Sequence, residues 1–346
     1  MRNRKSAGSH RYYLMSRNIE HLLGVLALLM LYPSPLLGLD RIRVGLSSVS
    51  SIHGAMWVTE EKGIFKKHGI EPEVIIIGGG SSRGMSALIA GDIQFVSASG
   101  DAVVNADLMG ADVVMVASVV NRGIQRIMAR PELKSPGDLK GKRVGVTRLG
   151  AASHLALGLM LKMWGMSPSD VHIMQVGSSP AMIASLDKGG IDAAVLSIPS
   201  VFVAEERGYR ILGDLADMDI YYLYQILGST RSYLRANRDR ASRFIRAFVE
   251  GIAFFKTSKK ESLEVLRKKL RIDPQGEKYL AKSYDLLAFT YYDRVPYPSI
   301  QGVDTVLDFV AKDNPKAKSA DPKSFVDSSI VKELDTSGFI NALYEK

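Results

Sequence analysis

Residues 141–154 read Gly-Lys-Arg-Val-Gly-Val-Thr-Arg-Leu-Gly-Ala-Ala-Ser-His, the pattern of a strand, a tight turn and a helix. The mostly apolar residues 144–147 predict the strand, and a helix is expected from Ala151. A helix that begins directly after a strand points free N–H groups and its positive dipole end toward the sheet edge. With Arg148 beside it, this end predicts a cradle for an anionic or strongly polar small molecule. An ordinary turn with a solvated arginine is the alternative.

A second copy of this pattern lies earlier in the chain. Residues 43–46, Arg-Val-Gly-Leu, correspond to residues 143–146, Arg-Val-Gly-Val, and each copy continues into a helix that carries a histidine, His53 or His154. Each then has a helix-ending glycine, a second apolar strand, a Gly-Ser turn, another helix and a third strand that ends in a polar turn. Two β-α-β-α-β units are therefore predicted. Such alternation indicates parallel sheets, which bind ligands at the carboxyl ends of their strands.

The two units predict an α/β protein with two lobes, and 346 residues are enough for two domains of ordinary size. We expect lobe one to comprise residues 41–128 with 223–346, and lobe two to comprise residues 129–222. The chain would cross between the lobes near residues 128–131 and again near 220–228. Two extended crossings predict a hinge that opens and closes a cleft.

Two local predictions concern the first lobe. Residues 52–65 have mixed helical spacing and predict one continuous helix. Residues 73–77, Glu-Val-Ile-Ile-Ile, predict a strand whose apolar run from Val74 is typical of a strand buried in a parallel sheet.

Residues 1–38 have the pattern of an export signal. Five Lys or Arg residues precede an apolar run at residues 22–31, which is broken by Tyr32-Pro33-Ser34-Pro35. The run is short for a transmembrane helix. Met15 is an alternative start, and an uncleaved membrane anchor stays open because Leu36-Leu37-Gly38 is a poor cleavage site. We expect a periplasmic or extracytoplasmic location.

Charge and composition exclude several classes of function. The formal net charge is +9, of which residues 1–38 contribute +4, and no run of Lys and Arg interleaved with aromatic residues predicts nucleic-acid binding. The chain contains no cysteine, which excludes disulfides, thiolate metal sites, a cysteine nucleophile and a lipoprotein anchor. Its six histidines form no metal-binding motif such as H-E-x-x-H. We predict no catalytic residue, no metal and no cofactor.

Three longer phrases carry a resemblance to a known family. They are residues 61–73 (Glu-Lys-Gly-Ile-Phe-Lys-Lys-His-Gly-Ile-Glu-Pro-Glu), 87–95 (Ala-Leu-Ile-Ala-Gly-Asp-Ile-Gln-Phe) and 138–146 (Asp-Leu-Lys-Gly-Lys-Arg-Val-Gly-Val). With them the chain resembles the type II periplasmic solute-binding proteins of ABC transporters, in the nitrate/sulfonate/taurine family that includes binders of thiamine-pyrimidine precursors. The resemblance implies two lobes, each a mixed, mostly parallel sheet flanked by helices, joined by two crossover strands. It also implies a monomer that captures a small polar or anionic organic solute and delivers it to a membrane permease and its ATPase.

The resemblance further implies that the polar turns after the first and third strands of each lobe line the cleft. The residues at these turns, which we predict to bind the ligand, are Ser50, Ser51, His53, Ser97, Ser99, Asp101, Arg148, Ala151, Ala152, Ser153, Ser197 and Pro199. For His53 and His154 the alternative is a polar residue that is solvated or caps its helix. Trp57, one helical turn after His53, is a candidate wall for an apolar part of the ligand, with packing in the core as the alternative. One face of a strand holding Tyr221, Tyr222 and Tyr224 is also expected to reach the cleft.

Two other classes of function compete with this interpretation. Thiamine-pyrimidine synthases resemble these binding proteins in fold, but they use a Cys-rich motif, and this chain has no Cys. The ligand-sensing part of a transcription regulator would need a helix-turn-helix domain, whereas the N-terminus here resembles an export signal.

Overall fold

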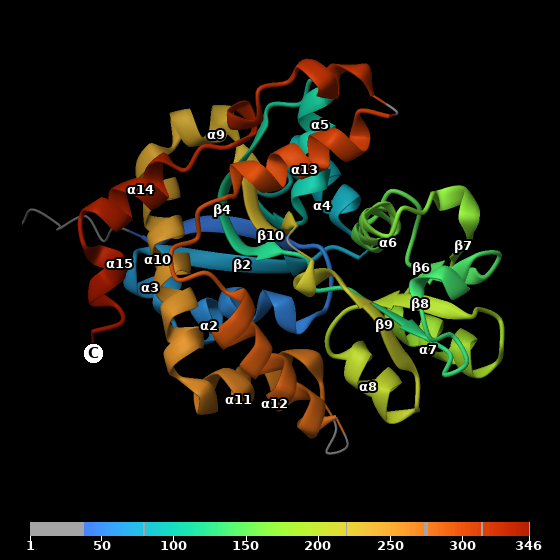
Figure 1. The fold of residues 1–346 in the computed structure, drawn as a ribbon. Coiled ribbons are helices and arrows are strands. Elements are labelled where there is room, and N and C mark those ends of the chain that lie inside the picture. Colours follow the sequence, from blue (N-terminus) through green and yellow to red (C-terminus); the bar gives the residue numbers. More distant parts are fainter. Residues whose placement is uncertain (1–37, 79, 219, 273–275, 313, 346) are drawn as a thin grey trace, which may run out of the picture. The chain divides into compact units, whose positions relative to one another are not determined.

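Two five-stranded sheets organise the chain (Figure 1). The computed structural model describes residues 38–345 apart from 79, 219, 273–275 and 313, so the predicted export segment 1–38 lies outside the described residues except for Gly38. Residues from Asp40 onward form one unit by their mutual contacts. None of the helices in the described part of the chain is both long and apolar enough to cross a membrane.

The first sheet has the strand order β2-β1-β3-β10-β4. Its strands are β1 (Asp40–Leu46), β2 (Ile70–Ile76), β3 (Phe95–Ala98), β4 (Val113–Arg122) and β10 (Tyr221–Thr230). β10 is antiparallel to both of its neighbours, and the other four strands run in one direction.

The second sheet repeats this arrangement with the order β7-β6-β8-β5-β9. Its strands are β5 (Arg126–Ala129), β6 (Arg143–Val146), β7 (His172–Gln175), β8 (Ala193–Leu196) and β9 (Arg210–Asp214). Here β5 is the antiparallel strand. The predicted α/β class, with two mostly parallel sheets flanked by helices, is therefore confirmed.

Helices cover both sheets (Figure 1). Those between the first-sheet strands are η1 (Ser51–His53), α2 (Gly54–Glu61), α3 (Ile64–Lys67), α4 (Ser81–Ile89) and α5 (Gly100–Leu108). Those among the second-sheet strands are η2 (Pro136–Leu139), α6 (Ala152–Met163), η3 (Pro168–Asp170), α7 (Ser179–Asp187) and α8 (Ser200–Glu206), and η4 (Leu215–Asp217) connects β9 to β10. The chain ends with α9 (Arg231–Ala236), α10 (Arg238–Thr257), α11 (Lys259–Leu270), α12 (Glu277–Leu286), the π-helix η5 (Leu287–Tyr291), α13 (Ile300–Val310), η6 (Pro315–Ser319), η7 (Pro322–Phe325), α14 (Ser329–Thr336) and α15 (Phe339–Ala342).

The repeated Arg-Val-Gly phrase has the same packing role in both sheets. A Cβ added to Gly45 in β1 would lie 2.6 Å from the Cδ1 of Ile93, and a Cβ added to Gly145 in β6 would lie 2.6 Å from the Cδ1 of Ile191. Each isoleucine lies shortly before the third strand of its own sheet. The glycine is therefore needed because the isoleucine side chain packs directly over the strand backbone.

Two local predictions in the first lobe are wrong. The helix expected over residues 52–65 is divided into η1, α2 and α3, and Gly63 adopts φ +68° before α3 begins. β2 is not buried on both faces: it pairs only with β1 at the edge of the sheet, and Ile76 is 47% exposed. An apolar run does not by itself distinguish a central strand from an edge strand.

The two crossings between the sheets lie side by side. A Cβ on Gly123 would lie 2.1 Å from the Cδ2 of Leu215, so the glycine leaves room for the returning chain. The Leu215 amide donates to the carbonyl oxygen of Gln125 at 3.0 Å, and Tyr221 pairs with Arg122. We expected a lobe boundary after residue 128, and this position falls inside β5, all of which pairs in the second sheet. We expected a connector at residues 220–228, and most of these residues form β10 in the first sheet.

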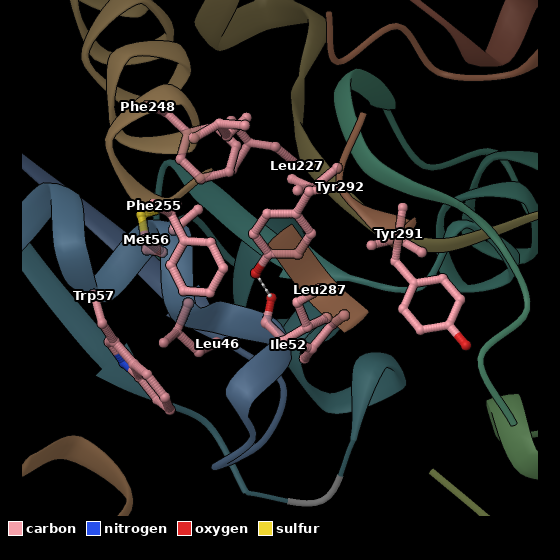
Figure 2. Packing of buried hydrophobic residues seen from close by; sticks show 14 of the residues in the cluster. Leu46, Ile52, Met56, Trp57, Leu227, Phe248, Phe255, Leu287, Tyr291 and Tyr292 are labelled. Atoms are coloured by element: carbon pink, nitrogen blue, oxygen red, sulfur yellow. Dashed lines mark hydrogen bonds between the residues drawn. The ribbon is translucent and has the colours of Figure 1, made fainter. Parts of the chain in front are cut away.

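Aromatic side chains fill the core beside the first sheet. Phe244 of α10 stacks between Phe95 of β3 and Phe65 of α3, with ring centroids 4.2 and 4.8 Å away. Figure 2 shows Trp57 in another part of the same cluster, where the Tyr292 hydroxyl donates to the carbonyl oxygen of Ile52 at 2.8 Å. Trp57 is 1% exposed, so it packs in the core and does not form a wall of a cleft.

Helices of the C-terminal part also contact the second sheet. Gly158 of α6 faces Phe309 of α13, where an added Cβ would lie 2.6 Å from the ring. Tyr291 of η5 lies beside the ion pair of Arg126 and Asp214, and its ring points away from Tyr292 in Figure 2. The two sheets are therefore joined by packing as well as by the crossings.

Candidate functional site

A buried polar cluster lies at the carboxyl ends of β1 and β3. His53 is 2% exposed, with Nδ1 3.3 Å from the Ser97 hydroxyl and Nε2 3.3 Å from the Ser48 hydroxyl. Gln225 of β10 donates to the Ser97 hydroxyl, and its Nε2 lies 3.4 Å from His53 Nδ1. Burial lowers the pKa of His53 to about 3. The imidazole is therefore neutral near pH 7, and the contacts fit a proton on Nε2 that is donated to Ser48.

A buried carboxyl group lies next to this cluster. Asp101, in the first turn of α5, accepts a hydrogen bond from the Tyr222 hydroxyl at 3.2 Å. Burial raises the pKa of Asp101, and the nearby hydroxyl groups of Ser99 and Tyr222 oppose that rise. The helix N-terminus also favours the carboxylate. Asp101 and Tyr222 thus form a polar pair that β10 places beside the end of β3.

A cavity of about 790 Å³ lies between α8, which follows β8 of the second sheet, and the C-terminal helices α11 and α12. Ser51 and Pro199 both line it, together with side chains of α8, α11 and α12. Close by, burial raises the pKa of Tyr224 on β10, and a hydrogen bond from Ser197, just after β8, opposes that rise. Two residues that follow the second sheet's β8 therefore approach groups of the first sheet.

The turn that precedes α6 is held by its own side chains. The Ser153 hydroxyl accepts from the Thr147 amide at 2.9 Å and lies 2.8 Å from the Thr147 hydroxyl. The Gly150 amide donates to His154 Nδ1 at 3.2 Å, so His154 satisfies a backbone group beside the start of the helix. Arg148 is exposed, and its side chain makes no ion pair within the described residues.

The structure brings some of the predicted ligand residues together and leaves others apart. A hydrogen bond joins His53 to Ser97, and Ser51 and Pro199 share the cavity. The Ser99 hydroxyl is buried and has no hydrogen-bond partner within the described residues. Ser50 accepts from the Ile52 amide at 3.5 Å and caps η1. No hydrogen bond among the described residues joins Arg148, Ala151 or Ala152 to the first-sheet cluster. The cluster and the α6 turn remain two separate parts of the predicted site.

Several residues of this region were not predicted from the sequence. Gln225 is the main one, since it lies between His53 and Ser97. Its signal was present, because a lone amide in the apolar run Tyr-Tyr-Leu-Tyr-Gln-Ile-Leu predicts a buried polar partner. The helices α8 and α12 gave no such signal, because their place beside the cavity depends on contacts far apart in sequence.

Comparison with known proteins places this architecture in a family. The family model described as "NMT1/THI5 like" matches residues 50–262, more than half of the chain and a range that contains every predicted ligand residue. The chain belongs to the NMT1/THI5-like family. This confirms the resemblance drawn from residues 61–73, 87–95 and 138–146.

Relatives of this NMT1/THI5-like protein are named as binding proteins. A Brucella abortus protein described as a binding protein is 28% identical over 230 residues, 65% of this chain and 70% of the relative. The taurine-binding periplasmic protein of Escherichia coli is 32% identical over 130 residues, 37% of this chain and 39% of that protein. The crystal structure of the periplasmic aliphatic sulphonate binding protein SsuA from Escherichia coli superposes with a TM-score of 0.70 at 20% identity, covering 83% of this chain and 92% of that one. This last likeness shows the shared fold.

Proposed function

We propose that this NMT1/THI5-like protein is the extracytoplasmic solute-binding component of an ABC importer. The observation that carries the proposal is the pair of equally ordered sheets, joined by two adjacent crossings, whose strand ends carry buried polar side chains beside a cavity. In open α/β sheets this edge is where ligands bind. The relatives named as periplasmic binding proteins support the same function.

The solute in this proposal is a small polar or anionic organic molecule held between the lobes. The cluster of His53, Ser97 and Asp101 and the cavity residue Ser51 would form one side of the site, and the cavity residue Pro199, which follows β8, would belong to the other side. The turn before α6 would form the other, with Ala151, Ala152 and Ser153 at the helix start and Ser197 opposite Tyr224. Backbone N–H groups at a helix start suit an anionic or polar group.

Closure of the lobes about the two crossings is part of the proposal. Gly123 and Leu215 lie together where the chain passes between the sheets, so a small backbone rotation there would move one sheet relative to the other. Small-angle scattering with and without a saturating ligand tests this. A radius of gyration that stays the same on binding would contradict lobe closure.

The protein would work without turnover, with a membrane permease and its ATPase as partners. The named relatives are binding proteins, and the chain has no cysteine for chemistry of the thiamine-pyrimidine synthase type. We propose a monomer in the periplasm or an equivalent extracytoplasmic space. Recovery of an altered solute after incubation with the pure protein would contradict this part, and reporter fusions to residues 1–38 test export.

The direct test of function is a thermal-shift screen of the purified protein. A ligand that binds only the native state raises the melting temperature as its concentration exceeds the Kd. The screen contains taurine, alkanesulfonates, nitrate, bicarbonate and pyrimidines. We expect a concentration-dependent rise for at least one class, which calorimetry then quantifies. A flat response to every class would count against a solute receptor of this kind.

Replacing Arg148 by alanine should weaken binding of the solute found in that screen by about ten- to a hundredfold. The guanidinium group is exposed beside the start of α6, where it can donate to a charged group of the ligand. Such a hydrogen bond contributes about 1.5–3 kcal/mol. Calorimetry on Arg148→Ala measures the loss, with Lys162→Ala near the other end of α6 as the matched control. Equal affinity of Arg148→Ala and the unmodified protein would remove Arg148 from the site.

A further inference from the structure

The cavity between α8 and the α11–α12 pair has mostly apolar walls. Val203 of α8, Leu270 of α11 and Leu280 of α12 line it from opposite sides, and Figure 1 shows these helices. Its volume of about 790 Å³ falls within the roughly 300–1,000 Å³ common for ligand pockets. An inorganic anion or a two-carbon compound would leave most of these apolar walls in contact with water.

The charged side chains that line the cavity already have partners. Glu206 of α8 pairs with Lys278 of α12, across the space between the two helices. Arg207 pairs with Asp187 of α7. Each charged side chain of the described lining therefore already has an oppositely charged partner, and none of them requires a charged group in this part of the ligand. The lining instead suits an uncharged, apolar portion of a molecule.

One buried side-chain polar atom of the described lining lacks a hydrogen-bond partner. The Ser51 hydroxyl is buried, with the residue 1% exposed, and it forms no hydrogen bond with the described residues. The other lining serine, Ser283, donates to the carbonyl oxygen of Tyr279 at 2.7 Å. Buried hydroxyl groups are rarely left unpaired, and Ser51 is one of the residues that line the cavity. This atom points to a ligand with a polar atom at that wall.

We propose that this cavity holds the apolar body of the solute, and that Ser51 forms a hydrogen bond to a polar atom on that body. The solute is then an organic molecule with an apolar part of at least four to six carbon atoms, joined to the polar or anionic group of the proposed function. This inference rests on that proposed function, because it assigns a solute class to the same site. A ligand of this class differs from small anions and from two-carbon sulfonates, which lack such an apolar part.

The test compares probes that share a polar group and differ in the apolar body. The three pairs are methanesulfonate and hexanesulfonate, acetate and heptanoate, and methylammonium and hexylammonium. Burial of each methylene strengthens binding by up to about fourfold. In at least one pair we expect the longer probe to bind at least tenfold more tightly by calorimetry.

Two variants locate the effect. Val203→Asn places an amide on the cavity wall and should remove most of the gain from chain length, whereas Ile211→Asn on the exposed side of β9 should retain it. Ser51→Ala should weaken binding of the longer probe about tenfold. It should also leave the melting temperature of the free protein unchanged or higher, since it removes an unpartnered buried hydroxyl.

The outcomes separate this inference from the function on which it rests. If, in every pair, the longer probe binds no more tightly than the shorter one, the apolar-body proposal is overturned. Thermal shifts with taurine, nitrate or pyrimidines would still support a solute receptor. Equal loss of the chain-length gain in Val203→Asn and Ile211→Asn would also overturn it. So would a Ser51→Ala variant that melts earlier and binds the longer probe with unchanged affinity. No response to any compound in either set would contradict both proposals.

Discussion

Replacing Phe244 by alanine is expected to lower the free energy of unfolding by about 3–5 kcal/mol, the range for deleting a large buried side chain. The Phe244 ring lies between Phe95 and Phe65, so one substitution removes two stacked contacts and leaves a cavity. The residue also joins α10 to β3 and α3, three elements that are far apart in sequence. Denaturant unfolding followed by circular dichroism measures the change.

The matched control for this substitution is Phe289→Ala. Phe289 has the same side chain but is 68% exposed, so its loss should change the free energy of unfolding by only about 0.5 kcal/mol. Similar values for the two variants would show that the stack of three rings does not stabilise the fold as described. A smaller slope with denaturant in Phe244→Ala alone would indicate a change in the surface exposed on unfolding.

The stability of the protein should fall as pH decreases below about 6.5 because of His53. Burial lowers the pKa of His53 from 6.5 to about 3 in the folded protein. Between these values the unfolded chain binds a proton at His53 and the folded protein does not, so acid favours unfolding. The contribution of this group amounts to about 1.4 kcal/mol per pH unit. Below about pH 3 both states are protonated and the loss is complete.

Denaturant unfolding of the unmodified protein and of His53→Gln at pH 7.5, 6 and 5 tests this prediction. Asp101 acts in the opposite sense, because burial raises its pKa and the folded protein retains a proton that the unfolded chain has lost. The difference between the two proteins at each pH isolates the histidine from Asp101. We expect this difference to shrink as pH falls, and exposed His172→Gln serves as the control. A difference that is constant over the three pH values would contradict a neutral, buried His53.

The fold was largely predictable because its pattern is local and occurs twice. Residues 43–46 and 143–146 begin the same series of strands and helices, and both sheets have the same order. The position of β10 was harder to predict from the sequence, because its pairing with β3 and β4 joins segments far apart in the sequence. The edge position of β2 has the same cause: its apolar residues do not specify how many neighbours the strand will have.

The candidate site was predictable in its residue types but not in the partners of each hydroxyl group. The serines after the strands are short polar residues in turns, and from the sequence they are equivalent. In the structure Ser153 holds its own turn and Ser97 contacts His53, whereas the Ser51 hydroxyl has no hydrogen-bond partner among the described residues. Those differences come from distant groups such as Gln225. Sequence spacing therefore predicts the edge of the sheet that binds a ligand, and tertiary packing decides which atoms are free to do so.

The insertion of β10 between β3 and β4 has a consequence for the order in which the chain folds during synthesis. β1 begins at Asp40, yet its sheet lacks a central strand until Tyr221–Thr230 has left the ribosome. The second sheet is complete earlier, since its last strand ends at Asp214. Chains fold from the N-terminus as they emerge, and non-local pairings form slowly. The lobe whose strands are made first is therefore the one finished last. A nascent chain that has emerged from the ribosome as far as Asp214, but not as far as Tyr221, should protect the second sheet, and not the first, from protease.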